Sequence, residues 1–227
     1  MLGVIGGMGP LATMLFYEMV TEITDADCDQ NNINMLILSD AAMPDRTKAI
    51  LSGETAEVRD RLLRDARRLE ENGCTALAVT CNTAHYFVDM IENEVGIPFI
   101  HMIRETALEM EKRFSGKKVA ILATDGTIKT GLYQKELEKH GIIPFAPDEK
   151  TQAAVMETIY GLIKQNKPAD RKLWDSIEGF CRASGCEGAI LACTELSVVR
   201  KELGLSESYY VDSMKVLAKR CVERFKK

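Results

Sequence analysis

The chain has 227 residues, of which 46% are hydrophobic and 28% charged, and its formal net charge is −5. A chain of this length and composition can bury most of its apolar surface without disulfides or metals, which excludes disordered and fibrous classes. We expect a cytoplasmic protein, because no apolar run approaches the ~20 residues of a bilayer span and the first residues do not resemble a signal peptide. The scattered Lys and Arg form no basic stripe, which argues against a nucleic-acid partner.

The chain contains seven cysteines, an odd number in a protein too large to need disulfide staples. We therefore expect reduced thiols. None of their spacings is C-x-x-C and there are only three histidines, so the sequence predicts neither a metal site nor a thioredoxin-type redox pair. The cysteines are Cys28, Cys74, Cys81, Cys181, Cys186, Cys193 and Cys221.

Short β-rich runs alternate with helical patterns from end to end of the chain. Residues 76–79 and 189–192 are continuous apolar runs, as is typical of strands buried on both faces. The alternation predicts an α/β fold in which parallel sheets are flanked by helices. In chain order the predicted strands are Leu2–Gly6, Asn34–Leu38, Ala76–Thr80, Pro98–His101, Lys118–Ala123, Ile142–Phe145, Gly188–Ala192 and Tyr209–Val211.

Three segments of the chain recur in the same order at similar offsets, and the clearest pair ends in Cys81 and, 112 residues later, in Cys193. Such a pattern predicts one α/β unit used twice. We expect an N-terminal lobe of residues 1–100, completed by a C-terminal helix 213–227, and a C-terminal lobe of residues 101–212. Two similar lobes would be related by a pseudo-two-fold axis, with the active site in the cleft between them.

Cys81 and Cys193 each follow an apolar strand and precede a predicted helix. Ligands of open α/β sheets bind at such strand ends. The free N–H groups and the dipole of the helix would lower a thiol pKa from ~8.5 to between ~3.5 and ~7.5. Because the two positions match in the repeat, we expect the thiols to face each other across the cleft.

Two acid/base groups on opposite faces of one carbon can invert its configuration, because one removes a proton and the other returns one from behind. A thiolate that faces a thiol is such a coupled pair. Hydrogen-bond donors at the α-carboxylate of an amino acid would stabilise the carbanion. The candidate donors, whose alternative role is helix capping, are Asn82, Thr83, Thr124, Thr127 and Thr194.

Five motifs resemble those of the aspartate/glutamate racemases, a family of cofactor-independent enzymes with two pseudo-symmetric α/β lobes. Cys-Asn-Thr-Ala and Cys-Thr-Glu are specific for the superfamily, and Pro-Asp-Arg-Thr points to the aspartate racemase branch. The motifs extend through nearly the whole chain: Gly-Gly-Met-Gly-Pro at 6–10, Pro-Asp-Arg-Thr at 44–47, Cys-Asn-Thr-Ala-His at 81–85, Ala-Thr-Asp-Gly-Thr at 123–127 and Cys-Thr-Glu at 193–195.

The resemblance implies an isomerase that interconverts L- and D-aspartate without pyridoxal phosphate, another cofactor or a metal, and that is a homodimer. Cys81 and Cys193 would be the two catalytic bases. Arg46 and Lys164 would bind the side-chain carboxylate, a role that agrees with the need of an acidic protein for dedicated cations. The remaining implied substrate contacts are Met8, Asn82, Thr83, Ala84, Thr124, Thr127 and Thr194, with Glu195 in support.

Other functions fit the same residues. A glutamate or broad-specificity racemase, or a cysteine-dependent isomerase of a small diacid such as maleate, is the nearest alternative, and a non-catalytic binding protein for an acidic amino acid is the third. A dinucleotide site is disfavoured, because Gly3 to Gly9 do not form a G-x-G-x-x-G motif. We expect His85 to be a local helix partner and His101 to make a structural hydrogen bond.

Overall fold

A computed structural model describes residues 1–226 of the chain, and Lys227, the last residue of the predicted C-terminal helix, lies outside the described part. The described strands form two parallel sheets of four, with the orders β2-β1-β3-β4 and β6-β5-β7-β8. We call the parts built on them the first and the second lobe. The strands are β1 Leu2–Gly6, β2 Met35–Ser39, β3 Ala76–Val79, β4 Phe99–Ile100, β5 Lys118–Ala123, β6 Ile143–Phe145, β7 Gly188–Ala192 and β8 Tyr210–Asp212.

The predicted α/β fold with two similar lobes is confirmed, and every predicted strand is present to within one residue at each end. The two sheets have the same strand order, as the sequence repeat predicts. The central strands β1, β3 and β7 are buried along their whole length, which explains their continuous apolar sequences.

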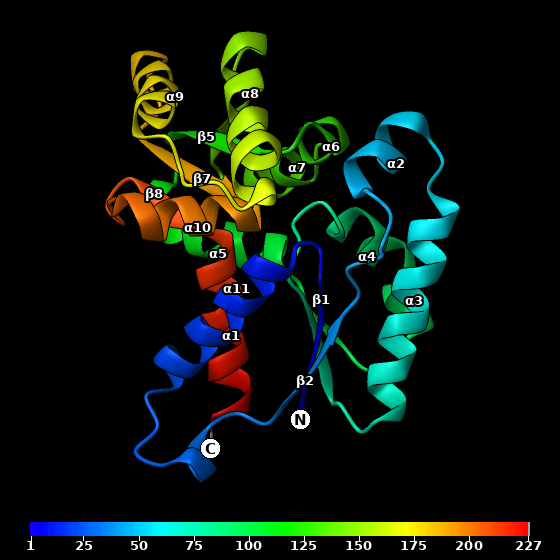
Figure 1. The fold of residues 1–227 in the computed structure, drawn as a ribbon. Coiled ribbons are helices and arrows are strands. Elements are labelled where there is room, and N and C mark those ends of the chain that lie inside the picture. The colour runs from blue at the N-terminus through cyan, green and yellow to red at the C-terminus, as the bar shows by residue number, and fades with distance from the viewer. Residues whose placement is uncertain (227) are drawn as a thin grey trace.

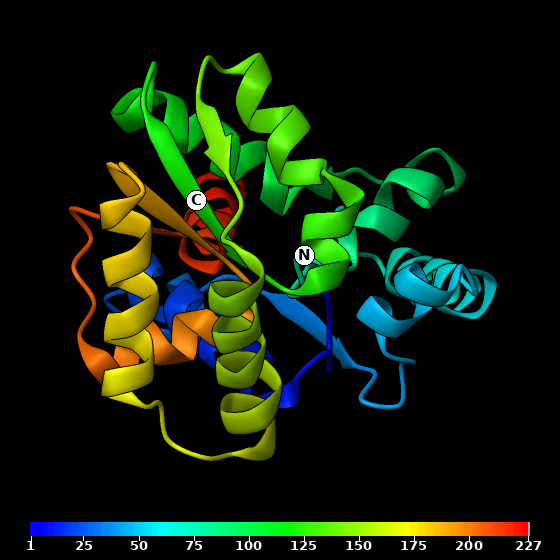
Figure 2. The ribbon, with the colours of Figure 1, turned by 90° about the horizontal axis from the view of Figure 1, so that it is seen from above.

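Helices cover the faces of both sheets, and the second lobe lies above the first in Figure 1. The same sheets are seen from above in Figure 2. None of the helices between residues 1 and 226 is both long and apolar enough to cross a membrane. The α-helices are α1 Pro10–Thr24, α2 Arg46–Ser52, α3 Ala56–Glu71, α4 His85–Ile91, α5 Met102–Phe114, α6 Asp125–Thr130, α7 Leu132–Lys139, α8 Glu149–Met156, α9 Arg171–Ala183, α10 Thr194–Leu203 and α11 Ser213–Phe225, and the π-helical η3 Glu157–Leu162 and 3-10 turn η4 Ile163–Gln165 continue α8.

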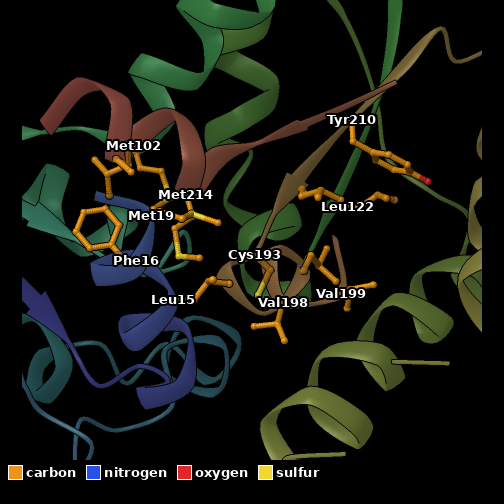
Figure 3. Close-up of a cluster of buried hydrophobic side chains, with 14 of the residues drawn as sticks. Leu15, Phe16, Met19, Met102, Leu122, Cys193, Val198, Val199, Tyr210 and Met214 are labelled. Carbon is orange, nitrogen blue, oxygen red and sulfur yellow. The ribbon is translucent and has the colours of Figure 1, made fainter. Parts of the chain in front are cut away.

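One apolar cluster is shared by the two lobes. It includes Leu15 of α1, Leu122 of β5 and Met214 of α11, all drawn in Figure 3. The C-terminal helix α11 packs against both α1 and α5 and therefore lies beside each lobe. Because this core is continuous, it does not mark a boundary at residue 100, and the division of the chain into 1–100 with 213–227 and 101–212 stays a prediction.

The lobes approach each other most closely where α6 meets α2. A Cβ atom added at Gly126 of α6 would lie 2.9 Å from the Cα of Thr47 and 3.2 Å from Cγ2 of Thr83. Glycine at this position therefore lets the backbones of the two lobes come together beside the strand ends.

Gly126→Ala is expected to lower the free energy of unfolding by about 1–3 kcal/mol, because the added methyl group overpacks against backbone and outweighs the better helix propensity of alanine. Gly179→Ala in α9 is the control, since no atom lies within 4 Å of its added Cβ, and it should raise stability by about 0.5–1 kcal/mol. Urea unfolding measures both changes. A Gly126→Ala protein as stable as the parent would contradict this tight contact.

Candidate functional site

The two cysteines predicted to be catalytic follow equivalent strands, Cys81 after β3 and Cys193 after β7, and both are buried. Cys193 is the N-cap residue of α10, as predicted. The prediction that Cys81 begins a helix is wrong, because α4 starts only at His85. Between Cys81 and His85 the chain makes a turn, in which the N–H of His85 donates to the carbonyl of Asn82 at 3.0 Å.

The thiol of Cys193 donates a hydrogen bond to Oε2 of Glu195 at 2.9 Å. The other oxygen of Glu195, Oε1, lies 2.7 Å from Nζ of Lys164 in an ion pair. Cys193 belongs to the apolar cluster that it shares with Leu15 and Val198 in Figure 3. Glu195 is therefore placed between the thiol of one predicted base and the ammonium group of a predicted substrate-binding cation.

Burial raises the pKa of Cys193 well above its usual value, and the negative charge of Glu195 raises it further, while Lys164 acts in the opposite direction. The prediction that the helix terminus lowers the pKa of this thiol is therefore wrong. The dipole of α10 is outweighed, because loss of hydration disfavours the thiolate and the neighbouring carboxylate repels it.

Arg46, the first residue of α2, lies beside Cys81 and is buried. Burial lowers the pKa of its guanidinium group, but the attraction of negative charges, that of a Cys81 thiolate first, raises the pKa above the usual value overall. Nη1 donates to the carbonyls of Met43 and Pro44 at 3.1 and 2.8 Å, and Nη2 donates to that of Met8 at 3.2 Å. Nε is buried without a partner, so Arg46 retains a free donor.

Lys164 lies in η4, on the segment of the second lobe that reaches the first. Its Nζ is 5.4 Å from the ring centre of Tyr160, whose hydroxyl donates to Oδ2 of Asp45 at 3.0 Å. Burial lowers the pKa of Lys164, but the charge of Glu195 and then that of Cys193 raise it above its usual value. The ammonium group therefore stays charged.

Three predicted hydroxyl donors meet at the junction of the lobes. Oγ1 of Thr83 lies 2.9 Å from that of Thr124 and 3.0 Å from that of Thr127, and the latter two are 3.1 Å apart. All three are buried. Oγ1 of Thr124 also accepts from the N–H of Thr127 at 3.3 Å and so caps α6. A hydroxyl can accept and donate at once, so Thr124 can keep this bond and still turn its proton toward a carboxylate.

The side chain of Asn82 is already bonded to the second lobe. Its Oδ1 accepts from the hydroxyl of Tyr133 at 2.6 Å, and its Nδ2 donates to Oγ of Ser213 at 3.0 Å. The hydroxyl of Thr194 reaches the carbonyl of Thr80 at 3.4 Å and so joins the lobes again. Tyr133, Ser213 and Thr80 were not predicted as site residues, and no local sequence pattern marks them.

Four of the predicted residues line a cavity of about 330 Å³ that lies between the lobes. Its described lining includes neither cysteine, but Glu195 contacts Cys193 and Arg46 lies beside Cys81. Ala84 is fully buried at the N-cap of α4 and is not among the lining residues. Cavities of about 420 and 530 Å³ lie elsewhere, against α10 and α3. The residues that line the cavity of about 330 Å³ between the lobes are Gly7, Met8, Gly9, Pro10, Leu11, Ala12, Ala41, Arg46, Ile163, Lys164, Asn166 and Glu195.

His85 has the structural role that was predicted for it. Its Nδ1 lies 2.9 Å from the carbonyl oxygen of Cys81, and its Nε2 accepts from the N–H of Met102 at 3.1 Å. Burial lowers the pKa of His85 to about 3, so the ring is neutral. His101 makes a hydrogen bond to Asp89 at 3.1 Å. In the described chain, no three His, Cys, Asp or Glu side chains are grouped so that they could hold a metal ion.

Residues 5–221 match the family described as Asp/Glu/Hydantoin racemase. The chain belongs to this family. It is 29% identical to the broad-specificity amino-acid racemase RacX of Bacillus subtilis over 99% of this chain and 98% of that one. The resemblance found in the sequence is thereby confirmed, and this racemase relative supports an amino-acid racemase as the general class of the protein.

Two solved structures share the fold over nearly the whole chain. The aspartate racemase of Picrophilus torridus superposes with a TM-score of 0.81 at 30% identity, covering 98% of this chain and 93% of its own. An aspartate racemase homologue from Pyrococcus horikoshii gives a TM-score of 0.78 at 26% identity, with coverages of 100% and 99%. The two-lobed racemase fold is therefore shared along the full length of the described sheets.

Alkylation of Cys193 by iodoacetamide should keep accelerating with pH beyond the range in which an ordinary thiol, of pKa ~8.5, becomes fully ionised. The reason is that the thiolate reacts and that the pKa of Cys193 is raised. Mass spectrometry of labelled peptides measures the rate at each pH, and the exposed Cys28 is the internal control. Rates at Cys193 that level off at the same pH as those at Cys28 would contradict this description.

Proposed function

We propose that this protein interconverts L- and D-aspartate without pyridoxal phosphate or another cofactor, with Cys81 and Cys193 as acid and base on opposite faces of Cα. The observation that carries the proposal is the placement of the two thiols at equivalent strand ends of the two lobes, with Glu195 joining Cys193 to the lining of the cavity between the lobes. Inversion at carbon needs such a pair, because the proton must leave from one face and return to the other.

The surrounding groups support an amino acid with a second carboxylate. The hydroxyls of Thr83, Thr124 and Thr127 converge between the lobes, where they can bind the α-carboxylate and stabilise the charge that develops when Cα loses its proton. Lys164 and Arg46 line the cavity and can bind the side-chain carboxylate, and the buried Nε of Arg46 has no other partner. These two cations can balance the charge of an anionic substrate in a protein whose net charge is −5.

A thiolate takes the proton from Cα, and the electron pair of the broken C–H bond is delocalised into the α-carboxylate. The second cysteine then gives its thiol proton to the opposite face of Cα and keeps the electron pair as a thiolate. The two cysteines exchange roles for the other enantiomer, so one site serves both directions.

The unmodified protein should racemise aspartate in deuterated water and incorporate deuterium at Cα, as polarimetry and NMR would record. Cys81→Ala and Cys193→Ala should each lower racemisation by at least about 10²-fold, because one face of Cα then lacks its acid/base group. Cys28→Ala, on the surface, is the control and should have no effect. Full racemisation by the Cys193→Ala protein would end the two-base mechanism.

A substrate panel of aspartate, glutamate, alanine and maleate separates the neighbouring functions. The relation to RacX is the observation that favours broader specificity, and one methylene in a pocket changes selectivity by only ~1–3 kcal/mol. Faster turnover of glutamate or alanine than of aspartate would replace aspartate as the substrate. Binding of aspartate without any turnover would favour a binding protein.

We also propose that the protein is a homodimer that associates through α1. Three large apolar side chains on this helix, Leu11, Met14 and Tyr17, are exposed at 39, 68 and 53% and follow one another at helical spacing. Met14→Glu should shift the protein toward monomer in analytical ultracentrifugation, whereas Met90→Glu, which alters an isolated exposed methionine, should not. A parent protein that sediments as a monomer would contradict the proposal.

A further inference from the structure

The two cysteines occupy equivalent positions in the repeat, but their neighbours carry opposite charges. Beside Cys81 lies the guanidinium group of Arg46, which attracts a thiolate. The thiol of Cys193 instead donates to the carboxylate of Glu195 at 2.9 Å. A carboxylate that accepts a hydrogen bond from a thiol stabilises the protonated form of that thiol and repels the thiolate. The two strand ends are therefore equivalent in the backbone and different in their chemistry.

Glu195 is held firmly in the position that produces this difference. It lies on the first turn of α10, two residues after Cys193, and only 4% of its surface is exposed. Oε1 is paired with Nζ of Lys164 at 2.7 Å, and Oε2 also accepts from the hydroxyl of Thr194 at 3.3 Å. One oxygen of Glu195 is therefore directed at Lys164, and the other is directed at the thiol of Cys193.

We propose that Glu195 keeps Cys193 protonated in the free protein and thereby assigns the roles of the two cysteines before a substrate binds, with Cys81 as the base and Cys193 as the acid. This inference rests on the proposed racemase function and adds to it a residue that acts through Cys193. Glu195 is a positioning residue for a proton, and it does not itself need to touch the reacting carbon.

The charged neighbours of Cys193 favour this assignment except for Lys164. Glu195 and Cys81 disfavour its thiolate, and Lys164 is the one cation among the charges that shift its pKa. Tyr133 and Tyr160 also lie within electrostatic reach, and burial raises the pKa of each, so both are neutral phenols. Because Lys164 is already paired with Glu195, its charge only partly compensates the burial of a thiolate.

The first turnover then follows in a defined direction. The Cys81 thiolate takes the proton of the enantiomer whose Cα–H faces it, and the Cys193 thiol delivers its own proton to the opposite face. The resulting Cys193 thiolate lies next to Glu195, so it is strongly basic and readily takes a proton back. For the other enantiomer, the proton must first move from Cys193 to Cys81.

This asymmetry leaves kcat/KM equal for the two enantiomers, because their equilibrium constant is unity. Its effect can be measured only in the separate steps in which Cys81 or Cys193 removes the Cα proton. A protein with Cys193→Ala can exchange the Cα proton only through Cys81, and a protein with Cys81→Ala can exchange it only through Cys193. For each aspartate enantiomer in deuterated water, NMR measures the rate at which deuterium replaces the Cα proton. The dependence of this rate on pH shows how each cysteine acts as a base.

Glu195→Gln in the Cys81→Ala protein should accelerate exchange through Cys193 at neutral pH, by at most about tenfold for each unit by which the pKa of the thiol falls, because more thiolate is present although each thiolate is a weaker base. The rising part of its pH profile should move to lower pH. The glutamine keeps the size and the acceptor oxygen of Glu195 but removes the charge. Glu195→Asp should retain slow exchange. A gain of rate is a result that a damaged structure would not produce.

Two matched comparisons accompany this test. The same Glu195→Gln change in the Cys193→Ala protein should move the pH profile of exchange through Cys81 much less. Glu187→Gln, which removes the glutamate of a surface pair with Lys117 at 3.1 Å, should move neither profile. Unchanged or slower exchange through Cys193 in the Glu195→Gln protein would overturn the proposal. Slower exchange would in addition indicate that Glu195 acts as a base that activates Cys193.

Alkylation of Cys193 provides a readout that needs no substrate. Glu195→Gln should move the alkylation profile of Cys193 to lower pH, and an unmoved profile would overturn the proposal. If the profile moves while no amino acid exchanges its Cα proton in the unmodified protein, the effect of Glu195 on Cys193 is supported and the racemase function is the part that fails.

Discussion

The junction of the two lobes depends on buried polar groups that find their partners only across it. Asn82 of the first lobe bonds to Tyr133 and Ser213, and Thr83 bonds to Thr124 and Thr127. A buried polar group without a partner costs about 1–3 kcal/mol, so the two surfaces can exclude water from these groups only because the groups pair with one another. The same interactions bring the predicted donors together, and the candidate site is therefore a product of the lobe contact.

Parallel strand register explains why these groups reach the junction at all. Ile5 of β1 pairs with Val79 of β3, and Ala123 of β5 pairs with Ala192 of β7, so neighbouring strands end side by side in each sheet. The residues that follow them must lie at one edge. Because the two sheets have the same strand order, Cys81 and Cys193 follow equivalent strands, β3 and β7.

Charge at the site is controlled by pairing. Lys164 is neutralised by Glu195, and two nitrogens of Arg46 are bonded to main-chain carbonyls. Arg46 is buried and Lys164 is partly exposed, and each has partners before any ligand binds, while Nε of Arg46 has none. A side-chain carboxylate that binds Lys164 must compete with Glu195, which links substrate binding to the group that controls Cys193.

The sequence by itself determined the strands, their parallel arrangement and the equivalence of Cys81 and Cys193, because apolar runs and repeated motifs are local patterns. It also marked Arg46, Thr83, Thr124 and Glu195 as members of the racemase motifs. It could not reveal that α4 begins only at His85 or that the pKa of Cys193 is raised. Those properties depend on burial and on contacts between residues far apart in the chain, such as Asn82 and Ser213, separated by 131 positions. Only the tertiary structure decided them, since desolvation and the charge of a neighbour act through space and leave no periodic trace in the sequence.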